Sequence, residues 1–462
     1  MKILIGVIIL FVGAFAQASA EPNVAFAKDF SNNFNDNMLN DGSNAGAVAT
    51  DAFSPSNSSP RDNLSSTKQA DSDVELRYGG TAGMRYRSNI YRQKNGATSD
   101  AVAIVAPAFA IRSDFDKHDL QVKGRVEAGY YASEQNNNYV KGDLQANSRL
   151  DVAQGEALDL HGRAKYDNVE IGGFIEDVGN PQNRAAVPIS YKFFDAGADY
   201  SKPLGEHVVG RTGVSAQLYD YDNTARAGGG KLIQDDRDRN EYHGYGLLGV
   251  PINVPTNSWL TNSIMPFVSV DSNARIYHRQ VARTAIYGRD SVGFGAYVGA
   301  QWNNREVDSI WANGKIGFMN QNYAQSALPD INDVGFNFEG AARLEQDTIL
   351  QLLAYRQVNE NTLIGASGAL QTRGQMAVIH GIDENWALDV NGRYTLNDFQ
   401  INPAFGKVGR KDNIYDGGLG VNYYIVDPLY ARADYQYINR NSSLDLANYN
   451  ESRAMLSLGM KY

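Results

Sequence analysis

Long runs of alternating residues constrain the fold of this chain more than any other feature. In one run the even positions are apolar or small and the odd positions are polar: Leu120, Val122, Gly124, Val126, Ala128 and Tyr130 against Gln121, Lys123, Arg125 and Glu127. Further runs lie at 140–152, 158–166, 207–218, 334–344, 386–394 and 429–437. A period of two is typical of a β-strand with one apolar and one polar face. Runs of about ten residues suit tilted membrane-spanning strands, whereas strands of soluble proteins are usually about five or six residues long. The pattern therefore predicts a membrane β-barrel.

The end of the chain is another such run. One face carries Leu456, Leu458, Met460 and Tyr462, and the other carries Arg453, Ser457, Gly459 and Lys461. An open strand edge leaves N–H and C=O groups unpaired, and within a bilayer only closure into a barrel removes that cost. A last strand that ends in an aromatic residue is similar to the C-terminal strand recognised by the barrel-assembly machinery of outer membranes. We therefore expect outer-membrane lipid and, during insertion, that machinery as partners.

The start of the chain has the pattern of a secretory leader. Lys2 precedes an apolar run from Ile3 to Phe15, and Ala18, Ser19 and Ala20 provide the small residues of a cleavage site. The run is shorter than the roughly 20 apolar residues of a spanning helix. Residues 1–20 are therefore predicted to be a signal peptide cleaved before Glu21, which directs export to a Gram-negative outer membrane.

The next segment, 21–72, is rich in Asn, Ser, Asp and Ala and has no sustained period. Such a segment cannot bury enough apolar surface to offset the entropy of ordering it. It is predicted to be a disordered periplasmic extension, with a short binding helix around Val24 to Phe34 as the alternative. The barrel itself is expected over 73–462.

The composition agrees with an exported, water-filled barrel. The chain has 45 glycines, 27 tyrosines and no cysteine, and its formal net charge is −10. Half of each barrel strand faces lipid and half faces water, which gives a chain that is rich in aromatics and yet polar. The acidic charge argues against a nucleic-acid partner.

The connections between runs alternate in length. The short ones are 113–119, 153–157, 202–207, 253–258, 304–309, 344–348, 383–386 and 426–429, and the longer ones are 176–188, 222–240, 279–290, 325–333, 397–411 and 441–451. Short periplasmic turns and long extracellular loops are typical of outer-membrane barrels. The fold class is therefore all-β, a transmembrane antiparallel barrel of about 18 strands, with 16 as the alternative because 239–252 and 347–370 alternate poorly.

Several segments carry a resemblance to a known family. They are GMRYRSNIYR (83–92), SDAVAIVAPAFAIRSDFDKHDL (99–120), LDVAQGEALDLHGRAKYD (150–167), DDRDRNEYHGYG (235–246) and the terminal strand. In these the chain resembles the putative β-barrel porins of alphaproteobacterial outer membranes, known as the second putative β-barrel porin family. The resemblance implies an outer-membrane barrel, in some members associated with exopolysaccharide export, and it assigns no individual functional residue.

The phase of the alternation places charged side chains in the lumen. The selectivity candidates are Arg85, Lys123, Arg125, Glu127, Arg149, Arg163, Lys165, Arg211, Arg393 and Arg432. Rings of charge are how pores select ions, so these residues predict passage of polar or anionic solutes. The competing and favoured interpretation is that neighbouring strands pair these charges and stiffen the wall without selecting anything.

Loop 222–240 is a possible constriction. It carries three glycines at 228–230 and the charged run Asp235, Asp236, Arg237, Asp238 and Arg239. A cation site is disfavoured because the aspartate spacing departs from the EF-hand pattern and the arginines would repel the ion. A solvated surface or a salt bridge at a strand start is the favoured interpretation.

No catalytic or cofactor motif is present. The histidines are scattered, and none lies in an H-E-x-x-H or G-x-S-x-G pattern. We therefore expect no enzyme, no cofactor and no metal, although His161 or His243 could meet a serine in space. The predicted function is porin-like passage of polar or anionic solutes, with a polysaccharide as a weaker candidate. The alternatives are a structural or adhesive barrel with a plugged lumen and, less favoured, an outer-membrane hydrolase.

Overall fold

The computed structural model describes residues 74–115, 118–171, 185–254, 262–278, 288–303, 310–345, 347–359, 366–402, 409–426 and 428–461. The predicted signal peptide at 1–20 and the predicted extension at 21–72 lie outside these residues, as does Tyr462. Within them, no helix is long and apolar enough to cross a membrane.

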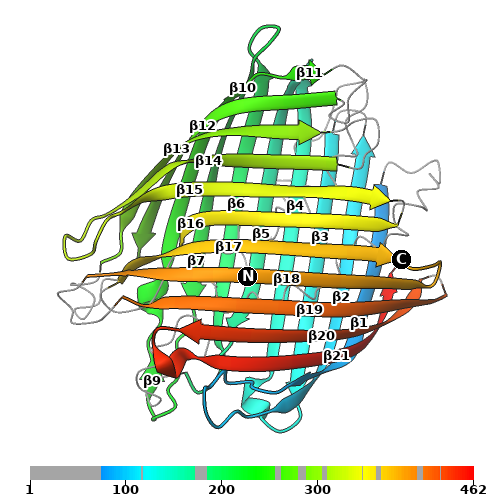
Figure 1. Cartoon of the computed structure of the whole chain (residues 1–462), viewed down its shortest axis with the longest axis vertical. Helices are drawn as coiled ribbons and strands as arrows, with labels where there is room; N and C mark the ends of the chain where they lie inside the picture. Colours follow the sequence, from blue (N-terminus) through cyan, green and yellow to red (C-terminus); the bar gives the residue numbers. More distant parts are fainter. Residues whose placement is uncertain are drawn as a thin grey trace, which may run out of the picture.

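Eighteen long antiparallel strands form one closed sheet, which confirms the predicted number (Figure 1). They are β1 (Val74–Arg87), β2 (Asp100–Phe115), β3 (His118–Tyr131), β4 (Tyr139–Ala153), β5 (Glu156–Val169), β6 (Ile189–Pro203), β7 (Val209–Tyr221), β10 (Arg239–Gly249), β12 (Asn262–Tyr277), β13 (Ser291–Asn303), β14 (Ile310–Tyr323), β15 (Ile331–Glu345), β16 (Thr348–Asn359), β17 (Ala366–Gly381), β18 (Trp386–Ile401), β19 (Lys411–Val426), β20 (Leu429–Ser442) and β21 (Tyr449–Lys461). The poorly alternating regions contain β10, β16 and the start of β17.

Small elements lie in the connections. β8 (Thr224–Ala225) and β9 (Lys231–Leu232) form a hairpin, and the 3-10 turns are η3 (Gln135–Asn137), η5 (Asp235–Arg237) and η7 (Asp445–Ala447). β11 (Ile252–Val254) pairs with β12, but β10 and β12 also pair directly, so β11 adds no strand to the ring.

The ring closes where the first strand meets the last. β1 pairs with β2 on one side and with β21 on the other, from Gly79 opposite Lys461 to Arg87 opposite Arg453. Closure leaves no exposed edge, which satisfies the backbone groups as a bilayer requires.

Connections gather at two ends of the barrel, called here the turn end and the loop end. β1 starts and β21 finishes at the turn end, together with the eight connections predicted to be short. The strand ends that border the six connections predicted to be longer lie at the loop end, as do the connections 88–99 and 132–138.

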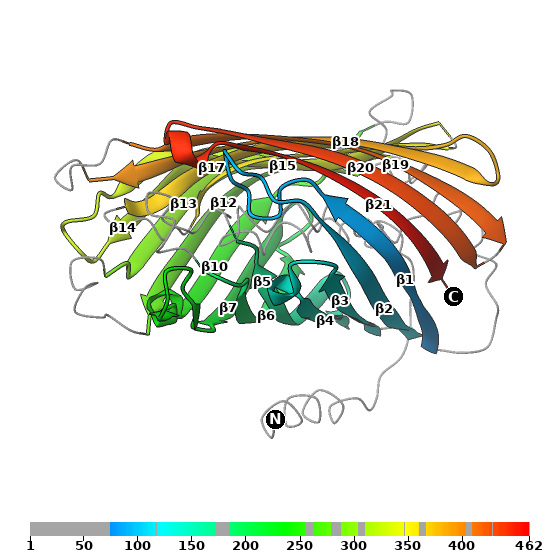
Figure 2. The same cartoon turned by 90° about the horizontal axis from the view of Figure 1, so that it is seen from below.

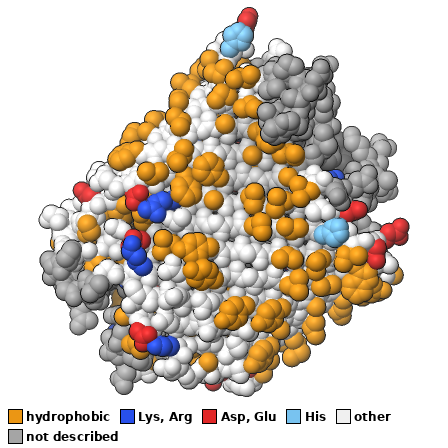
Figure 3. All heavy atoms as spheres, in the orientation of Figure 1, with side chains coloured by type: hydrophobic (Ala, Val, Ile, Leu, Met, Phe, Trp, Pro, Cys, Tyr) orange, Lys and Arg blue, Asp and Glu red, His pale blue; other side chains and the backbone are white. Residues whose placement is uncertain are grey.

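The two faces of each strand differ as the alternation predicts. Large apolar side chains point outward, and the most exposed are Leu456 at 68% and Val214 at 65%. Figure 3 shows apolar groups spread over the outer face, with charged groups mostly toward its margins. This surface suits lipid, because a spanning barrel carries an apolar outer band.

The barrel is flattened rather than round. Seen in Figure 2, the wall of β17–β21 lies over the opposite wall that contains β3–β7 and β10. A flattened ring brings strands that are far apart in the sheet within reach of each other across the lumen.

Candidate functional site

The charged residues proposed as selectivity candidates lie on the inner face of the sheet. In β3, for example, Val126 and Tyr130 are exposed on the outer face, so Lys123, Arg125 and Glu127 face the lumen. The same parity places the other candidates inside: Arg85, Arg149, Arg163, Lys165, Arg211, Arg393 and Arg432.

Most of these charges pair with acids on the same or a neighbouring strand. Lys165 contacts Asp167 at 2.7 Å, and Arg125 contacts Glu127 at 2.9 Å. Further pairs join Arg149 to Asp151 and Asp159, Arg163 to Asp143, Arg211 to Asp159, and Arg393 to Asp416. Neighbouring opposite charges of this kind stiffen a wall and weaken the field of each single charge.

Some pairs reach over a whole strand, and a glycine on that strand makes room for them. Tyr245 on β10 donates its hydroxyl hydrogen to Asp199 on β6 at 2.5 Å, directly over Gly213 on β7. Arg432 on β20 contacts Asp389 on β18 at 2.6 Å, over Gly420 on β19. A side chain at either glycine would occupy the position of the bond.

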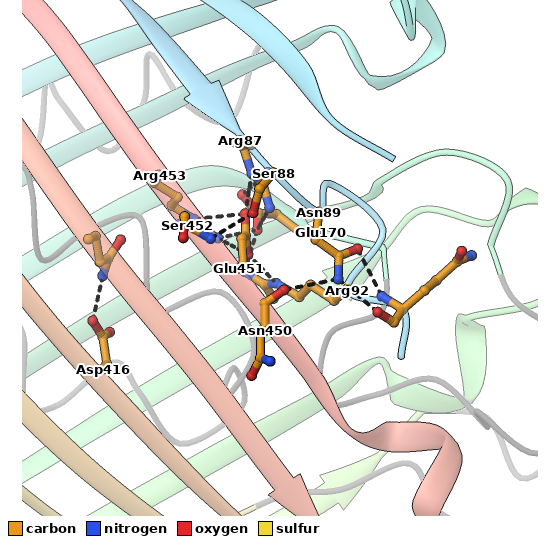
Figure 4. Close-up of polar contacts among 12 residues, drawn as sticks. Arg87, Ser88, Asn89, Arg92, Glu170, Asp416, Asn450, Glu451, Ser452 and Arg453 are labelled. Carbon is orange, nitrogen blue, oxygen red and sulfur yellow. Dashed lines mark hydrogen bonds and ion pairs between the residues drawn. The ribbon is translucent and has the colours of Figure 1, made fainter. Parts of the chain in front are cut away.

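A buried ion cluster at the loop end was not found from the sequence (Figure 4). Glu170, just after β5, accepts hydrogen bonds from Arg87 at 3.0 Å, Arg92 at 2.5 Å and Arg453 at 3.4 Å. Glu451 on β21 lies 2.6 Å from Arg87 and is fully buried. Three strands separate β5 from β1, about 19 Å along the sheet, so this contact crosses the interior.

The cluster fixes the charge of its members. Burial alone would raise the pKa of Glu170, but Arg87, Arg92 and Arg453 lower that pKa well below its usual value. Burial would likewise lower the pKa of Arg92, but Glu170 raises it above the usual value. Both groups therefore stay charged over the whole ordinary pH range.

Opposite walls of the barrel meet in an apolar cluster at the loop end. β6 and β7 supply Ile189, Tyr191, Phe193, Tyr219 and Tyr221, and β17 and β18 supply Ala366, Ala369 and Phe399. Eight strands lie between β6 and β18 in either direction around the ring, so these strands are diametrically opposed. We call this cluster the wall contact.

Buried charges at the loop end lie on both sides of the wall contact in the order of the ring. The Glu170 cluster joins β1, β21 and the end of β5. Arg239 and Glu241 lie on β10, Arg275 lies on β12, and Arg373 lies on β17. Lumen-facing side chains at this end are mostly buried, whereas those at the turn end are mostly half-buried.

Side chains of β10 and β12 also make contacts across the interior. Arg239 and Arg275 hold the two oxygens of Glu241 at 2.7 Å and 3.2 Å. Arg275 also donates to the backbone carbonyl of Val358 on β16 at 3.0 Å, past three intervening strands. The Arg373 guanidinium lies 5.3 Å from the ring centre of Tyr355.

The predicted constriction run 235–239 combines surface and lumen roles. Asp235 bonds Asn223, and Asp238 accepts the backbone N–H of Tyr221 at 2.7 Å. Arg237 is buried with its guanidinium 3.6 Å from the ring centre of Tyr221, and Arg239 forms the strand-start salt bridge to Glu241. The arginines of this run, rather than its aspartates, face the lumen.

The histidines form no hydrolytic constellation in the part of the chain described here. Ser215 stands opposite His243 in the β7–β10 register, but the Nε2 atom of His243 has no hydrogen-bond partner among these residues. Glu241 lies 3.7 Å from His243 and is already bound by two arginines. Over the described residues, no group of His, Asp or Glu is arranged to hold a metal ion.

Comparison with protein families identifies the family of this barrel. A family model described as "Putative beta-barrel porin 2" matches residues 80–462. No curated protein matches the chain.

Three solved structures give matches of low identity. The siderophore receptor PirA of Pseudomonas aeruginosa is 8% identical, with a TM-score of 0.39 over 84% of this chain and 80% of that chain. A mutant of the ferric enterobactin receptor PfeA from the same organism is 6% identical, with a TM-score of 0.41 over the same shares. OccAB3 of Acinetobacter baumannii is 9% identical, with a TM-score of 0.39 over 84% of this chain and 100% of that chain.

Proposed function

The chain belongs to the family described as Putative beta-barrel porin 2, and from this premise we propose that it provides porin-like passage for small polar solutes, with a preference for anions. The observation that carries the proposal is the inner face, which is lined with charged and amide side chains from the turn end to the loop end. A polar inner face of this kind can hold the water that a passage for polar solutes requires.

The preference for anions rests on the loop end. Among the described residues, buried arginines gather there around shared carboxylates: Arg87, Arg92 and Arg453 contact Glu170 or Glu451, and Arg410 and Arg440 contact Asp412. Positive charge in a narrow segment with low-dielectric walls attracts anions and repels cations.

The wall contact argues for small solutes rather than a polymer. A polysaccharide chain would have to separate β6 and β7 from β17 and β18 along the passage, at the cost of exposing the apolar cluster to water. Exopolysaccharide export therefore stays a weaker proposal, supported by the family resemblance alone.

The direction of passage follows from two further proposals. If residues 1–20 direct export and 21–72 remain in the periplasm, β1 starts on the periplasmic side. The turn end is then periplasmic, and the wall contact lies near the cell surface. Antibody access to a tag inserted in 132–138 on intact cells tests this orientation; no access to the tag would reverse it.

A structural or adhesive barrel is the second candidate, because the wall contact and the Glu170 cluster both place side chains across the lumen. The two candidates differ in conductance. We expect the refolded chain to give discrete channel openings in a planar bilayer, with a reversal potential in a salt gradient that indicates anion preference. Protein that inserts and migrates as a folded barrel but never conducts would contradict passage and favour the structural role.

A further inference from the structure

We propose that His161 is a specificity-determining residue, whose charge adjusts the ion preference of the passage between neutral and mildly acidic pH. A histidine side chain ordinarily gains or loses its proton between about pH 5 and 8. The inference rests on the proposed passage of polar solutes and names how its preference for anions is regulated. His161 lies on β5, on the face opposite the exposed side chain of Tyr166, and therefore points into the lumen.

The imidazole ring of His161 lies over β6, and a glycine makes room for it. Gly197 is the register partner of His161, and an added Cβ there would lie 2.4 Å from Cε1 and 2.5 Å from Nε2 of the ring. A side chain at this position would therefore displace the imidazole. Without one, the ring lies between the two residues that flank Gly197 on the lumen face of β6.

Those two residues are aspartates, and they face the two nitrogens of the ring. Nε2 of His161 lies 3.4 Å from Asp195, and Nδ1 lies 3.8 Å from Asp199. A neutral imidazole carries a hydrogen on only one nitrogen, whereas an imidazolium carries one on each. Only the protonated ring can therefore present an N–H to both carboxylates. All three side chains are between 11% and 25% exposed, which allows them to exchange protons with solvent.

Other charged groups face the same part of the lumen from the strands around His161. Arginines among them keep their charge over this pH range. His243 is a second histidine, and its Nε2 lies 3.7 Å from Glu241, so its contribution has to be measured in parallel. The remaining groups are Asp143 and Arg149 on β4, Asp159 and Arg163 on β5, Arg211 on β7 and Tyr245 on β10.

Protonation of His161 makes the lumen one charge more positive. A unit charge about 10 Å from the path of an ion through water changes the passage of that ion about twofold. We therefore expect the anion to cation permeability ratio to rise about twofold when the pH falls from about 8 to about 5.5. This change adds to the preference for anions that the loop end provides.

The test is the reversal potential of the refolded chain in a planar bilayer, in a salt gradient at about pH 8 and about pH 5.5. His161→Gln should lose most of the pH-dependent change, because glutamine is polar but cannot become charged. His161→Lys, which is charged at both pH values, should show at the higher pH the permeability ratio that the wild type reaches only at the lower pH. The matched control is His380→Gln, on the outer face of β17, where His380 contacts Thr348 at 2.8 Å. It should leave the change intact.

Three results would overturn the role of His161. They are a wild-type permeability ratio that is the same at both pH values, a full pH-dependent change in His161→Gln, and loss of that change in His243→Gln alone. If His161→Gln fails to fold, as judged by heat-modifiable migration in gels, His161→Lys carries the test.

The same recordings separate this inference from the proposed function. Conduction with a permeability ratio that does not depend on pH overturns the role of His161 and leaves passage intact. A barrel that inserts but never conducts overturns passage itself. An NMR titration of isotope-labelled histidine rings adds a measurement that needs no conduction, with the His161 signal identified by its loss in the variants. A conducting barrel in which that signal does not titrate between about pH 5 and 8 would also overturn the inference alone.

Discussion

At the scale of single residues, Glu170 connects strands that are far apart in the sheet. It lies just beyond the end of β5 and binds arginines that belong to β1, to the connection after β1 and to β21. Because those arginines also share Glu451, the loss of one carboxylate leaves buried positive charge only partly compensated. Removing one partner of a buried ion pair is much more costly than removing an exposed pair.

Glu170→Gln is therefore expected to lower the free energy of unfolding by about 3 kcal/mol. Urea unfolding of the protein in lipid vesicles, followed by tryptophan fluorescence, measures the change. The control is Asp445→Asn, which removes an exposed carboxylate that pairs with Lys94 at 2.5 Å and should have little effect. Equal losses in the two variants would contradict a stabilising role for the cluster.

The same residue predicts the pH dependence of stability. The pKa of Glu170 is lowered on folding, so its contribution is fully present above the pKa of an unfolded glutamate, about 4.3, and is lost as the pH falls through the folded pKa. Wild-type barrel should therefore lose stability on acidification below about pH 4.3, and Glu170→Gln should lose less over the same range. If both proteins lost the same amount of unfolding free energy across that pH range, the result would exclude this linkage.

At the scale of elements, β19 contains two glycines in different surroundings. Gly420 faces the lumen, and an added Cβ there would come within 2.5 Å of Arg432 and 2.6 Å of Asp389. Gly417 faces outward, and nothing lies within 4 Å of its Cβ position. The first glycine permits an ion pair to cross its strand, whereas the second leaves open space.

Gly420→Ala is expected to destabilise the barrel by about 1–3 kcal/mol, because the bridging ion pair must move or break. Gly417→Ala, on the same strand, should be neutral or slightly stabilising, because the added methyl group is unhindered. Urea unfolding in vesicles compares the two. If Gly417→Ala were the more damaging variant, the bridge over Gly420 would not be what this strand requires glycine for.

The last strand allows a test of membrane embedding. Leu456 lies mid-strand and is 68% exposed, whereas Met460 lies near the turn end of β21. An arginine facing lipid costs about 2–4 kcal/mol at the bilayer midplane and much less near the interface. Leu456→Arg should therefore reduce stability in vesicles more than Met460→Arg does. Equal effects would mean that the two positions lie at the same depth.

At the scale of the whole molecule, flattening of the ring brings side chains of opposite walls into contact at the loop end. Phe399 of β18 packs in one cluster with aromatic side chains of β6 and β7. The Arg410 guanidinium lies 5.0 Å from the ring centre of Phe399. Because these strands are opposed in the ring, any widening of the loop end must separate them. If the barrel provides the proposed passage, the wall contact limits its width at the loop end.

Phe399→Ala should increase single-channel conductance, because it removes the largest side chain that β18 contributes to the wall contact. It should also lower stability by about 3 kcal/mol, as is usual when a buried phenylalanine is truncated. Tyr394→Ala, on the outer face of β18, is the control and should leave conductance unchanged. An unaltered conductance in Phe399→Ala would show that the narrowest part of the passage lies elsewhere.

The sequence by itself predicted the strands, a number of about 18 with 16 as the alternative, and the faces of the alternating side chains, because these follow from a local period of two. Arg163 and Arg432 face the lumen for that reason, and β1 pairs with β21 because a barrel in lipid must close. The partners of Glu170, the reach of Arg275 to Val358 and the wall contact were decided only by the tertiary structure. They depend on how far the ring is flattened. That shape brings together strands that are far apart in the sheet, and no local sequence pattern predicts such contacts.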